Sequence, residues 1–299
     1  MHFYIIFLSI LIIANIGFGQ TILYVDKDVP TADGDGSSWA NAFKYLNDAL
    51  EAVPIGNDIY NIWIAEGTYY PDEGSLHAND SSSSSFNLNR GSFLEIFGGF
   101  YGNETDVSQR DSKKYITTLS GLIYNEHEVD NLGCDRLLVL SNNLDSSEST
   151  IGSFVYLIGF TVTNKSTLNG SVLYLENSGS VGSRDFNAIE CVFENCTSTS
   201  SIIYNRAEMG LSVEINEEEG YYPTPNEIRS TTQYALRINN SSFINCEAGG
   251  NIIDGIGSIN FSLFSGNKAE NIIYNPPNAL YCTALYDNIF ESNAIFIKI

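Results

Sequence analysis

Two short segments place cysteines where they could bind a metal or form a disulfide. ECVFENC, residues 190–196, holds Cys191 and Cys196 beside two carboxylates, and SSFINC, residues 241–246, repeats much of it with one cysteine. Thiolates bind zinc, and paired thiols form disulfides in oxidising compartments. A third alternative is that these cysteines are small buried residues that recur with the fold. Stacked, buried thiols are favoured, and the other two alternatives stay open at this point.

The other cysteines and the histidines support no metal or cofactor site. No CxxC pair occurs, and the histidines stand far in sequence from any second ligand. An odd number of cysteines leaves at least one unpaired or paired outside the chain. We therefore expect no metal-binding residue and no cofactor. The cysteines are Cys134, Cys191, Cys196, Cys246 and Cys282, and the histidines are His2, His77 and His127.

Carboxylates are the other candidates for chemistry, because glycoside hydrolysis needs two of them facing the scissile bond. One set lies on or near expected strands, and the other forms an acidic loop around His127. Neither set comes with a catalytic motif, and solvated carboxylates on an outer face are the simpler interpretation, so no catalytic residue is assigned. The first set is Glu176, Asp185, Glu190 and Glu194, and the second is Glu126, Glu128, Asp130 and Asp135.

Two further features have both a binding and a structural interpretation. DGDG at 33–36 could hold calcium, but a full calcium loop closes with a bidentate glutamate and none stands at that spacing. A flexible turn is therefore favoured. Tyrosines outside the repeat described below could stack on sugar rings, although packing is favoured for them too. These tyrosines are Tyr69, Tyr70, Tyr101, Tyr221 and Tyr222.

The first residues of the chain indicate export. Residues 1–19 contain an apolar run from about Phe3 to Ile13 and a small-residue exit, GFG, which is typical of a secretory signal peptide, although no lysine or arginine precedes the run. The run is shorter than the roughly 20 residues that a membrane helix needs. We expect cleavage before Gln20 and no membrane span in the mature chain; an uncleaved anchor is the alternative.

Charge excludes two classes of partner. The chain has 14 Lys+Arg against 36 Asp+Glu, a formal net charge of −22. Nucleic acids and anionic membrane surfaces attract basic proteins, so neither is an expected partner. Hydrophobic residues make up 43% and aromatic residues 12%, which is enough for a packed core.

A repeat runs through the second half of the chain. Four segments align on a phenylalanine: CVFENC, SSFINC, SLFSGN and NIFESN. The isoleucine-rich runs SIIYN, NIID and NIIYN follow three of them, so each unit is expected to hold two short strands separated by a turn. The aligned residues are Phe193, Phe243, Phe264 and Phe290, with Cys196, Cys246, Asn267 and Asn293 three positions later and Cys191, Ser241, Ser262 and Asn288 two positions earlier.

The spacing of the phenylalanines predicts a solenoid. The intervals are 33 from Phe160, then 50, 21 and 26 residues, and coils of 20 to 26 residues with added loops give this pattern. The acidic stretch at about 206–233 is interpreted as a loop excursion, with a degenerate coil that uses LSVEI as the alternative. Stacked coils would place each phenylalanine over the next and each asparagine or cysteine over its equivalent.

The region from 20 to 70 is expected to form an N-terminal cap with the first coil. ILYVD at 22–26 predicts a strand, WANAFKYLNDALEAV at 39–53 predicts an amphipathic helix that Pro54 ends, and IYNIWIAEGTYY at 59–70 predicts another strand. A helix laid across the end of a solenoid covers its exposed strand edges. Residues 71–299 then form the stacked coils, and the apolar NAIFIKI at the C-terminus has nothing predicted to cover it.

Several blocks together resemble secreted bacterial right-handed parallel β-helix proteins of the pectin-lyase-like class, in the branch with polymorphic-outer-membrane-protein-type repeats. They are the SSWANAF cap, IWIAEGTYYP, FLEIFGGFYGNETDVSQRD at 93–111, TTLSG at 117–121 and LIGFTVTN at 157–164. The resemblance implies an all-β fold, a three-faced right-handed parallel β-helix (solenoid) with an N-terminal capping helix, exported to the medium or the cell surface. Leu122 replaces the family's usual acidic residue after LSG.

The expected function is that of a non-catalytic adhesin-like stalk or a glycan- or protein-binding module. Its expected partners are extracellular polysaccharide or a surface protein. The alternative is a divergent polysaccharide lyase or glycoside hydrolase of the same fold class, since that fold carries enzymes as well as inert stalks.

Overall fold

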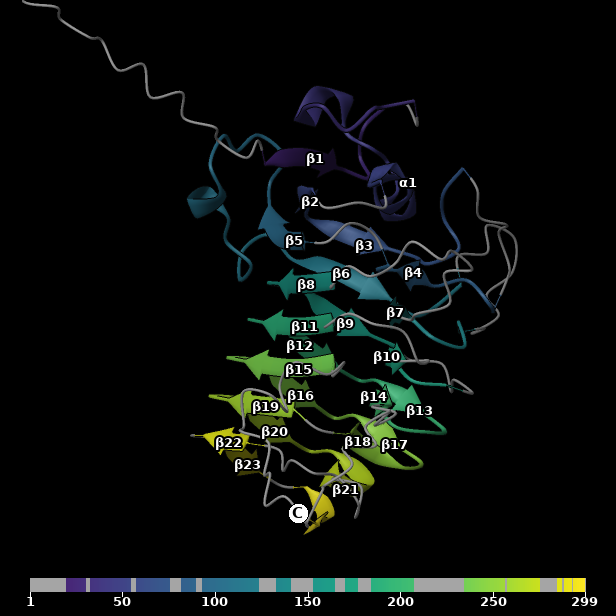
Figure 1. Cartoon of the computed structure of the whole chain (residues 1–299), viewed down its shortest axis with the longest axis vertical. Helices are drawn as coiled ribbons and strands as arrows, with labels where there is room; N and C mark the ends of the chain where they lie inside the picture. Colours follow the sequence, from purple (N-terminus) through teal and green to yellow (C-terminus); the bar gives the residue numbers. More distant parts are fainter. Residues whose placement is uncertain are drawn as a thin grey trace, which may run out of the picture.

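The computed structural model describes residues 20–30, 33–54, 58–75, 82–89, 93–123, 133–140, 153–164, 170–176, 184–206, 234–255, 257–274, 284–286, 288–291 and 293–298. In these segments the chain forms three parallel β-sheets, named A, B and C, and one short α-helix. The chain visits A, B and C in turn, and one such passage is called a coil. Figure 1 shows the coils stacked along one axis, from the purple N-terminal end to the yellow C-terminal end.

Each sheet takes one strand from each successive coil. Sheet A is β1 (Thr21–Val25), β2 (Ile59–Ala65), β5 (Phe93–Phe100), β8 (Ser153–Ile158), β11 (Arg184–Ile189), β15 (Tyr234–Asn239), β19 (Gly257–Asn260) and β22 (Ala284–Tyr286). Sheet B is β3 (Gly67–Tyr69), β6 (Thr117–Ser120), β9 (Thr161–Thr163), β12 (Val192–Glu194), β16 (Ser242–Ile244), β20 (Leu263–Ser265) and β23 (Ile289–Glu291). Sheet C is β4 (Phe86–Asn87), β7 (Leu138–Leu140), β10 (Leu173–Glu176), β14 (Ile203–Arg206), β18 (Asn251–Asp254) and β21 (Lys268–Tyr274), joined by β13 (Thr197–Ser198), β17 (Glu247–Ala248) and β24 (Ala294–Lys298).

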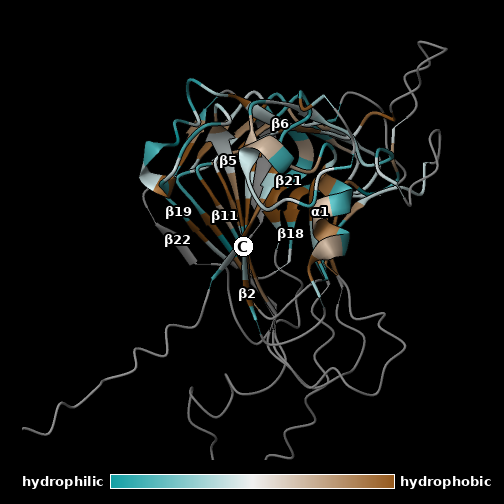
Figure 2. Cartoon of the chain, turned by 90° about the horizontal axis from the view of Figure 1, so that it is seen from above, coloured by the Kyte–Doolittle hydropathy of each residue, from teal (hydrophilic) through white to brown (hydrophobic). Residues whose placement is uncertain are grey.

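This arrangement confirms an all-β fold built from parallel sheets. The repeat pattern predicted two strands per unit, and that count was wrong, because three are present, in agreement with the three faces that the resemblance implies. The additional strand lies in sheet A, just before each phenylalanine motif, as β11 lies before Phe193. In its register, like residues lie over one another: Ile62 pairs with Ile96, and Ile96 with Leu157. Figure 2 shows brown, apolar strands inside and hydrophilic turns at the periphery.

The predicted phenylalanine column is present in sheet B. The rings of Phe193 and Phe243 stack with centroids 4.7 Å apart, Phe243 and Phe264 with 4.9 Å, and Phe264 and Phe290 with 5.0 Å. Phe160, from which the first interval was counted, lies outside this column. Phe193 pairs with Val162 of the preceding coil, so Phe160 stands two positions earlier, at the level of Cys191. Either side chain fills the interior, because Phe160 and Val162 are both buried.

The predicted column of thiols and amides is also present, and it shows why the two residue types alternate. The Cys246 Sγ lies 3.4 Å from the carbonyl oxygen of Phe193 in the preceding coil, and the Asn267 Nδ2 lies 2.9 Å from the carbonyl oxygen of Phe243. The thiol therefore donates where the amide donates. Stacked, unpaired thiols are confirmed for the described cysteines, since the free and buried residues are Cys134, Cys191, Cys196 and Cys246. Cys282 lies outside the described residues.

The corners between sheets need a left-handed backbone, which restricts the residues found there. At the corner from A to B the residues with positive φ are Gly159, Glu190, Asn240 and Phe261, and at the corner from B to C they are Asn195, Asn245 and Gly266. Glycine and asparagine adopt this conformation at least cost. Glu190 is therefore an exception, with φ 55° at a corner where the next coil has Asn240.

The N-terminal end is covered by a segment rather than by the long helix that was predicted. Only Leu46–Ala52 forms an α-helix, α1, and Trp39–Asn41 forms a 3-10 turn, η1. Between them Phe43 bridges to Val25 in parallel and donates its N–H to the carbonyl of Tyr24. Pairing with the free edge of β1 satisfies backbone groups that an uninterrupted helix would leave exposed. The apolar face of α1 still packs inward, against β1 and β4.

The DGDG sequence forms the turn that begins this covering segment. Asp35 accepts a hydrogen bond from the N–H of Ser37 at 3.0 Å. Gly36 has φ 74°, accepts from Tyr24 N–H and donates to the carbonyl of Asn41. Glycine is required here, because the ring of Phe43 would lie 2.4 Å from a Cβ. These contacts agree with the turn interpretation of DGDG.

Candidate binding groove

A loop at 101–116, between β5 and β6, forms one wall of the candidate site. Glu104 organises its first turn by accepting backbone N–H bonds from Tyr101 at 2.7 Å and from Gly102 and Asn103 at 3.0 Å. Burial alone would raise the pKa of Glu104, but these N–H donors outweigh it and lower that pKa below its ordinary value. The loop is tied to the N-terminal end because Trp39 Nε1 donates to the carbonyl of Glu104 at 2.9 Å.

The Gly98-Gly99 pair lets this loop lie directly against the sheets. Gly99 has φ 94°, and a Cβ there would stand 2.7 Å from the backbone nitrogen of Ser112. Instead, Asp111 donates its N–H to the carbonyl of Gly99 at 2.7 Å. Further along, a 3-10 turn, η2 (Val107–Gln109), begins with a capping box between Asp106 and Gln109. The loop is consequently held by its own backbone bonds on the corner between sheets A and B.

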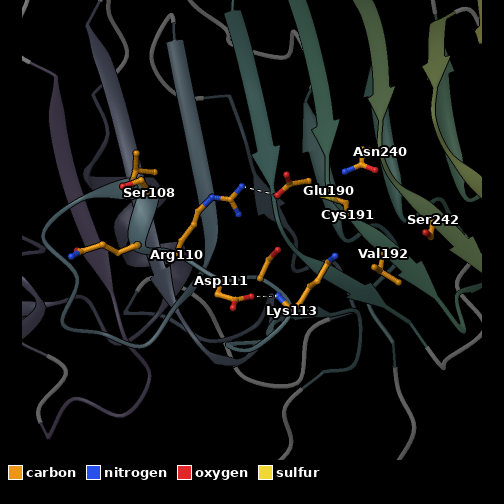
Figure 3. Close-up of a pocket in the computed structure, with 12 residues that line it drawn as sticks. Ser108, Arg110, Asp111, Lys113, Glu190, Cys191, Val192, Asn240 and Ser242 are labelled. Carbon is orange, nitrogen blue, oxygen red and sulfur yellow. Dashed lines mark hydrogen bonds and ion pairs between the residues drawn. The ribbon is translucent and has the colours of Figure 1, made fainter.

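Arg110 connects the loop to a coil far away in sequence. Its Nη2 lies 2.7 Å from the Glu190 Oε2, and its side chain is only 18% exposed. The guanidinium also lies 6.0 Å from the centre of the Phe97 ring and passes close to Gly159, where a Cβ would stand 2.6 Å from Nη1. The left-handed backbone of Glu190 directs its carboxylate toward the loop rather than into the core (Figure 3).

The space between the loop and the corner is a groove of about 780 Å³. One wall is residues 107–113, and the other is residues 190–192 together with Asn240 and Ser242. Figure 3 shows the Arg110–Glu190 ion pair across the groove, with Lys113 on the loop side. Two of the 14 basic residues of this acidic chain are thus in one small site, and half of the other lining residues have hydroxyl or amide side chains.

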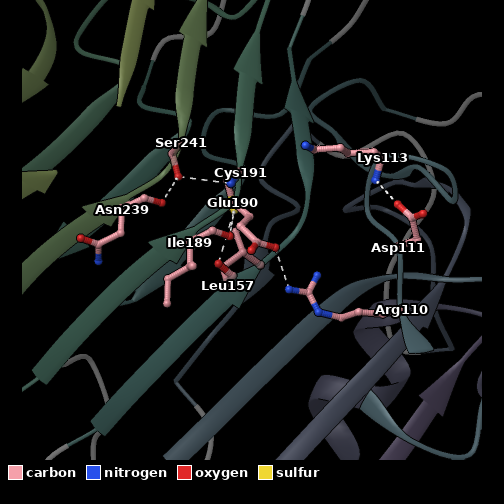
Figure 4. Close-up of polar contacts among 9 residues, drawn as sticks. All are labelled: Arg110, Asp111, Lys113, Leu157, Ile189, Glu190, Cys191, Asn239 and Ser241. Atoms are coloured by element: carbon pink, nitrogen blue, oxygen red, sulfur yellow. Dashed lines mark hydrogen bonds and ion pairs between the residues drawn. The ribbon is translucent and has the colours of Figure 1, made fainter. Parts of the chain in front are cut away.

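The carboxylates of the groove are already engaged in structural contacts. Glu190 is paired with Arg110, and the Asp111 Oδ1 accepts the backbone N–H groups of Lys113 and Lys114, both at 3.1 Å. Figure 4 shows the contacts of Glu190 with Arg110 and of Asp111 with Lys113, and the adjoining bond from Cys191 N–H to Ser241 Oγ at 3.2 Å. Hydrolysis requires one carboxylic acid and one carboxylate free to face a substrate. The arrangement is suited instead to hydrogen bonding with a polar ligand.

The other acidic candidates whose side chains the structure describes lie apart from this groove. Asp185 forms an ion pair with Arg237 at 2.6 Å, and Glu194 is half-buried on β12. Asp135 lies at the edge of a second hollow of about 400 Å³, near sheet C, beside Arg136. The side chain of Glu176 lies outside the described residues, as does the acidic loop with Glu126, Glu128, Asp130 and His127.

The four cysteines that the structure describes belong to the core. Burial raises the pKa of Cys191 to about 11 and that of Cys134 to about 12, which disfavours the thiolate that binds metals. The Cys191 Sγ donates to the carbonyl of Leu157 at 3.3 Å. Among the described residues no group of three or more His, Cys, Asp or Glu side chains is placed to hold a metal ion.

The candidate tyrosines include a core residue and one exposed residue whose ring packs on a neighbouring tyrosine. Tyr69 is buried and donates to the carbonyl of Ala65 at 3.1 Å, so it is a core residue. Tyr101 is 57% exposed, and its ring lies 5.4 Å from that of Tyr115, beside the ammonium of Lys114. This pair is on the same loop as the groove. Tyr70 is half-buried, and Tyr221 and Tyr222 lie outside the described residues.

The sequence analysis named Glu190 as a candidate but named neither Arg110, which pairs with it, nor the other basic residue of the opposite wall, Lys113. Arg110, Lys113 and Tyr115 stand in QRDSKKY, a basic run in an acidic chain, and that local reversal of charge was an available signal. The side of the stack on which the run lies is not encoded in any periodic pattern.

Comparison of the chain with protein families, with curated proteins and with solved structures finds no match. In the described part of the chain no helix has the length and hydrophobicity to cross a membrane.

Proposed function

We propose that this chain is an exported, right-handed parallel β-helix that acts without catalysis as a surface or secreted binding module, with polysaccharide as its ligand. The passage of the chain through three parallel sheets, coil after coil, supports the β-helix. The apolar run and GFG exit in residues 1–19 support export. The resemblance to pectin-lyase-like proteins agrees with both.

The groove between the 101–116 loop and the corner at Glu190 is the observation that carries the binding function. It presents Lys113, Asn240 and Ser242 to one open space, and such donors and acceptors match the hydroxyl groups of a sugar chain. Its carboxylates are held by Arg110 and by backbone N–H groups. That engagement favours binding over the alternative of a divergent lyase or hydrolase.

A binding assay with matched variants tests this function. Affinity electrophoresis over a panel of soluble polysaccharides is expected to show retardation in at least one gel, and Lys113→Ala with Asn240→Ala to weaken it about tenfold. Lys268→Ala is the control, because Lys268 carries the same charge in an exposed ion pair with Glu247 on sheet C. The groove assignment would be contradicted if Lys268→Ala weakened retardation as much as the groove variants do, or if no polysaccharide retarded the protein.

A second assay separates binding from catalysis. Reducing-sugar release and unsaturated-product absorbance are expected to stay at background over the same panel. Clear turnover that Glu190→Gln abolishes would replace the binding module with an enzyme. Export is tested separately by the mass of the protein secreted from a bacterial host, with Gln20 as the expected first residue.

A further inference from the structure

The charged side chains of the groove balance one another, although the chain as a whole is strongly acidic. The charged lining residues are two cations, Arg110 and Lys113, and two carboxylates, Asp111 and Glu190. The whole chain, by contrast, has a formal net charge of −22. Arg110 and Glu190 pair across the groove, with 2.7 Å between Nη2 and Oε2. The charge that a ligand meets in the groove therefore depends on this pair.

Arg110 reaches the corner because a glycine precedes Glu190 in the stack. Gly159 occupies the same corner position one coil earlier, by the register of β8 and β11. A Cβ at Gly159 would lie 2.6 Å from Arg110 Nη1, so this glycine leaves the space that the guanidinium needs. Asn240 occupies the corner position one coil later. The corner thus carries glycine, glutamate and asparagine in succession, and the carboxylate lies beside the guanidinium (Figure 4).

Glu190 occupies its corner position at a conformational cost. Its φ is 55°, and Asn240 at the next corner has φ 48°. Asparagine tolerates this left-handed backbone better than glutamate does. A residue held in a disfavoured conformation at the wall of a groove indicates a functional reason for its type. The ion pair with Arg110 is the contact that asparagine would not supply.

The carboxylate of Glu190 is also the more accessible partner of the pair. Its side chain is 41% exposed, against 18% for Arg110, so an entering ligand meets the carboxylate first. A carboxylate offers about four acceptor sites, and Arg110 uses one oxygen of Glu190. Sugar hydroxyl groups can donate to the others. A carboxylate or sulfate group on the sugar would instead be repelled by the like charge.

We propose, on the basis of the polysaccharide binding proposed above, that Glu190 is the specificity-determining residue of the groove and restricts its ligand to uncharged glycan. Glu190 does so in two ways, because it neutralises Arg110 and opposes anionic groups. Removing its charge would release the guanidinium of Arg110, which lines the groove. A free guanidinium binds carboxylate or sulfate through two parallel N–H bonds. Glycans of the same backbone are thus distinguished by their charge.

Affinity electrophoresis on pairs of gels that differ only in charge tests this role. Each pair holds a neutral polysaccharide, such as dextran, galactomannan or hydroxyethylcellulose, and its carboxymethylated form. The wild-type protein is expected to be retarded by at least one neutral polysaccharide and to run freely in the carboxymethylated form. Glu190→Asn is expected to bind that carboxymethylated form about tenfold more tightly than the wild type, through charge-assisted hydrogen bonds from Arg110.

Three further variants assign this gain to the charge of Glu190. Glu190→Gln keeps the length of the side chain and is expected to gain the same binding. Asp185→Asn is the matched control, because it removes the carboxylate of a similar ion pair, with Arg237 at 2.6 Å on sheet A, and it is expected to gain nothing. Adding Arg110→Gln to Glu190→Asn is expected to remove the gain. Thermal melts followed by circular dichroism show that each variant is folded.

The possible results separate the role of Glu190 from the binding function. Retardation of the wild type by a carboxymethylated form as strong as by its neutral form would overturn the role of Glu190 and leave polysaccharide binding in place. So would the absence of any gain in folded Glu190→Asn and Glu190→Gln, or an equal gain in Asp185→Asn. If no polysaccharide of either kind retards the wild type, the binding function fails, and the role of Glu190 fails with it.

Discussion

Replacing Phe243 by alanine tests whether the ring column holds the coils together. Phe243 is fully buried and stacks on Phe193 and Phe264, with interplanar angles of 3° and 2°. Buried Phe→Ala changes cost about 3–5 kcal/mol, and each lost ring pair adds about 0.5–1.5 kcal/mol. Because the two terms overlap, we expect a loss of about 4–6 kcal/mol in the free energy of unfolding.

Phe290→Ala is the matched comparison within the same column. Phe290 stacks on one ring only and is 36% exposed, so about 1–2 kcal/mol is expected from the smaller buried area and single pair. Phe243→Leu keeps most of the apolar volume and is expected to cost less than Phe243→Ala.

Urea unfolding followed by far-ultraviolet circular dichroism gives these free energies. Tryptophan fluorescence reports the N-terminal end alone, since Trp39 and Trp63 are the two tryptophans of the chain; a difference between the two probes would show that the coils unfold separately. Equal costs for Phe243→Ala and Phe290→Ala, or a cost below about 1 kcal/mol for Phe243→Ala, would refute the stacked column as a source of stability.

Three further predictions concern single residues. Burial raises the pKa of Glu73 to about 7. Between its ordinary pKa and about pH 7 the folded protein therefore keeps a proton on Glu73 that the unfolded chain releases. The stability that this proton contributes is fully present below the ordinary pKa of glutamate and is lost as pH rises through about 7. Glu73→Gln should therefore stabilise the protein by about 1–2 kcal/mol at pH 8 and by little at pH 5 in thermal melts; the same gain from exposed Glu291→Gln would contradict burial as the cause. Glu104→Ala should cost about 2–4 kcal/mol, because three backbone N–H groups lose a charged acceptor; Glu291→Ala is the control, and an equal cost would contradict that role. Alkylation of the buried Cys134, Cys191, Cys196 and Cys246 at pH 8 should occur only on unfolding; rapid labelling of any of them in the native protein, read by peptide mapping, would show that the coils open.

The repeat was predictable from sequence because stacking makes equivalent positions chemically alike. Phe243 over Phe264 and Asn267 over Asn293 both follow from matched offsets within each coil. The same reasoning counted the first interval from Phe160, an aromatic residue that lies outside the column. Val162 occupies that column instead, because the interior requires an apolar side chain of suitable volume and not a particular type.

The helix and the groove were harder to predict for a different reason. The apolar residues at 39–53 fit a helical period, yet the backbone of Phe43 pairs with the edge of β1 instead of continuing a helix. The spacing of apolar residues contains no information about this pairing. The groove depends on Arg110 and Glu190, which are 80 residues apart. Contacts between a loop and a distant coil follow from the fold and leave no periodic signal.

Cysteine and asparagine occupy equivalent positions in the ladder but make different contacts with the preceding coil. Asparagine binds the preceding coil twice, through a donor and an acceptor, as Asn267 does with Phe243 O and Cys246 N–H. A thiol such as that of Cys246 makes the weaker donor contact alone but leaves no second polar group in need of a partner. Depth in the stack does not decide between the two residue types, because the buried Asn164 and Asn267 lie as deep as Cys196 and Cys246. What differs is the number of contacts, since the amide binds through both a donor and an acceptor and the thiol through a donor alone.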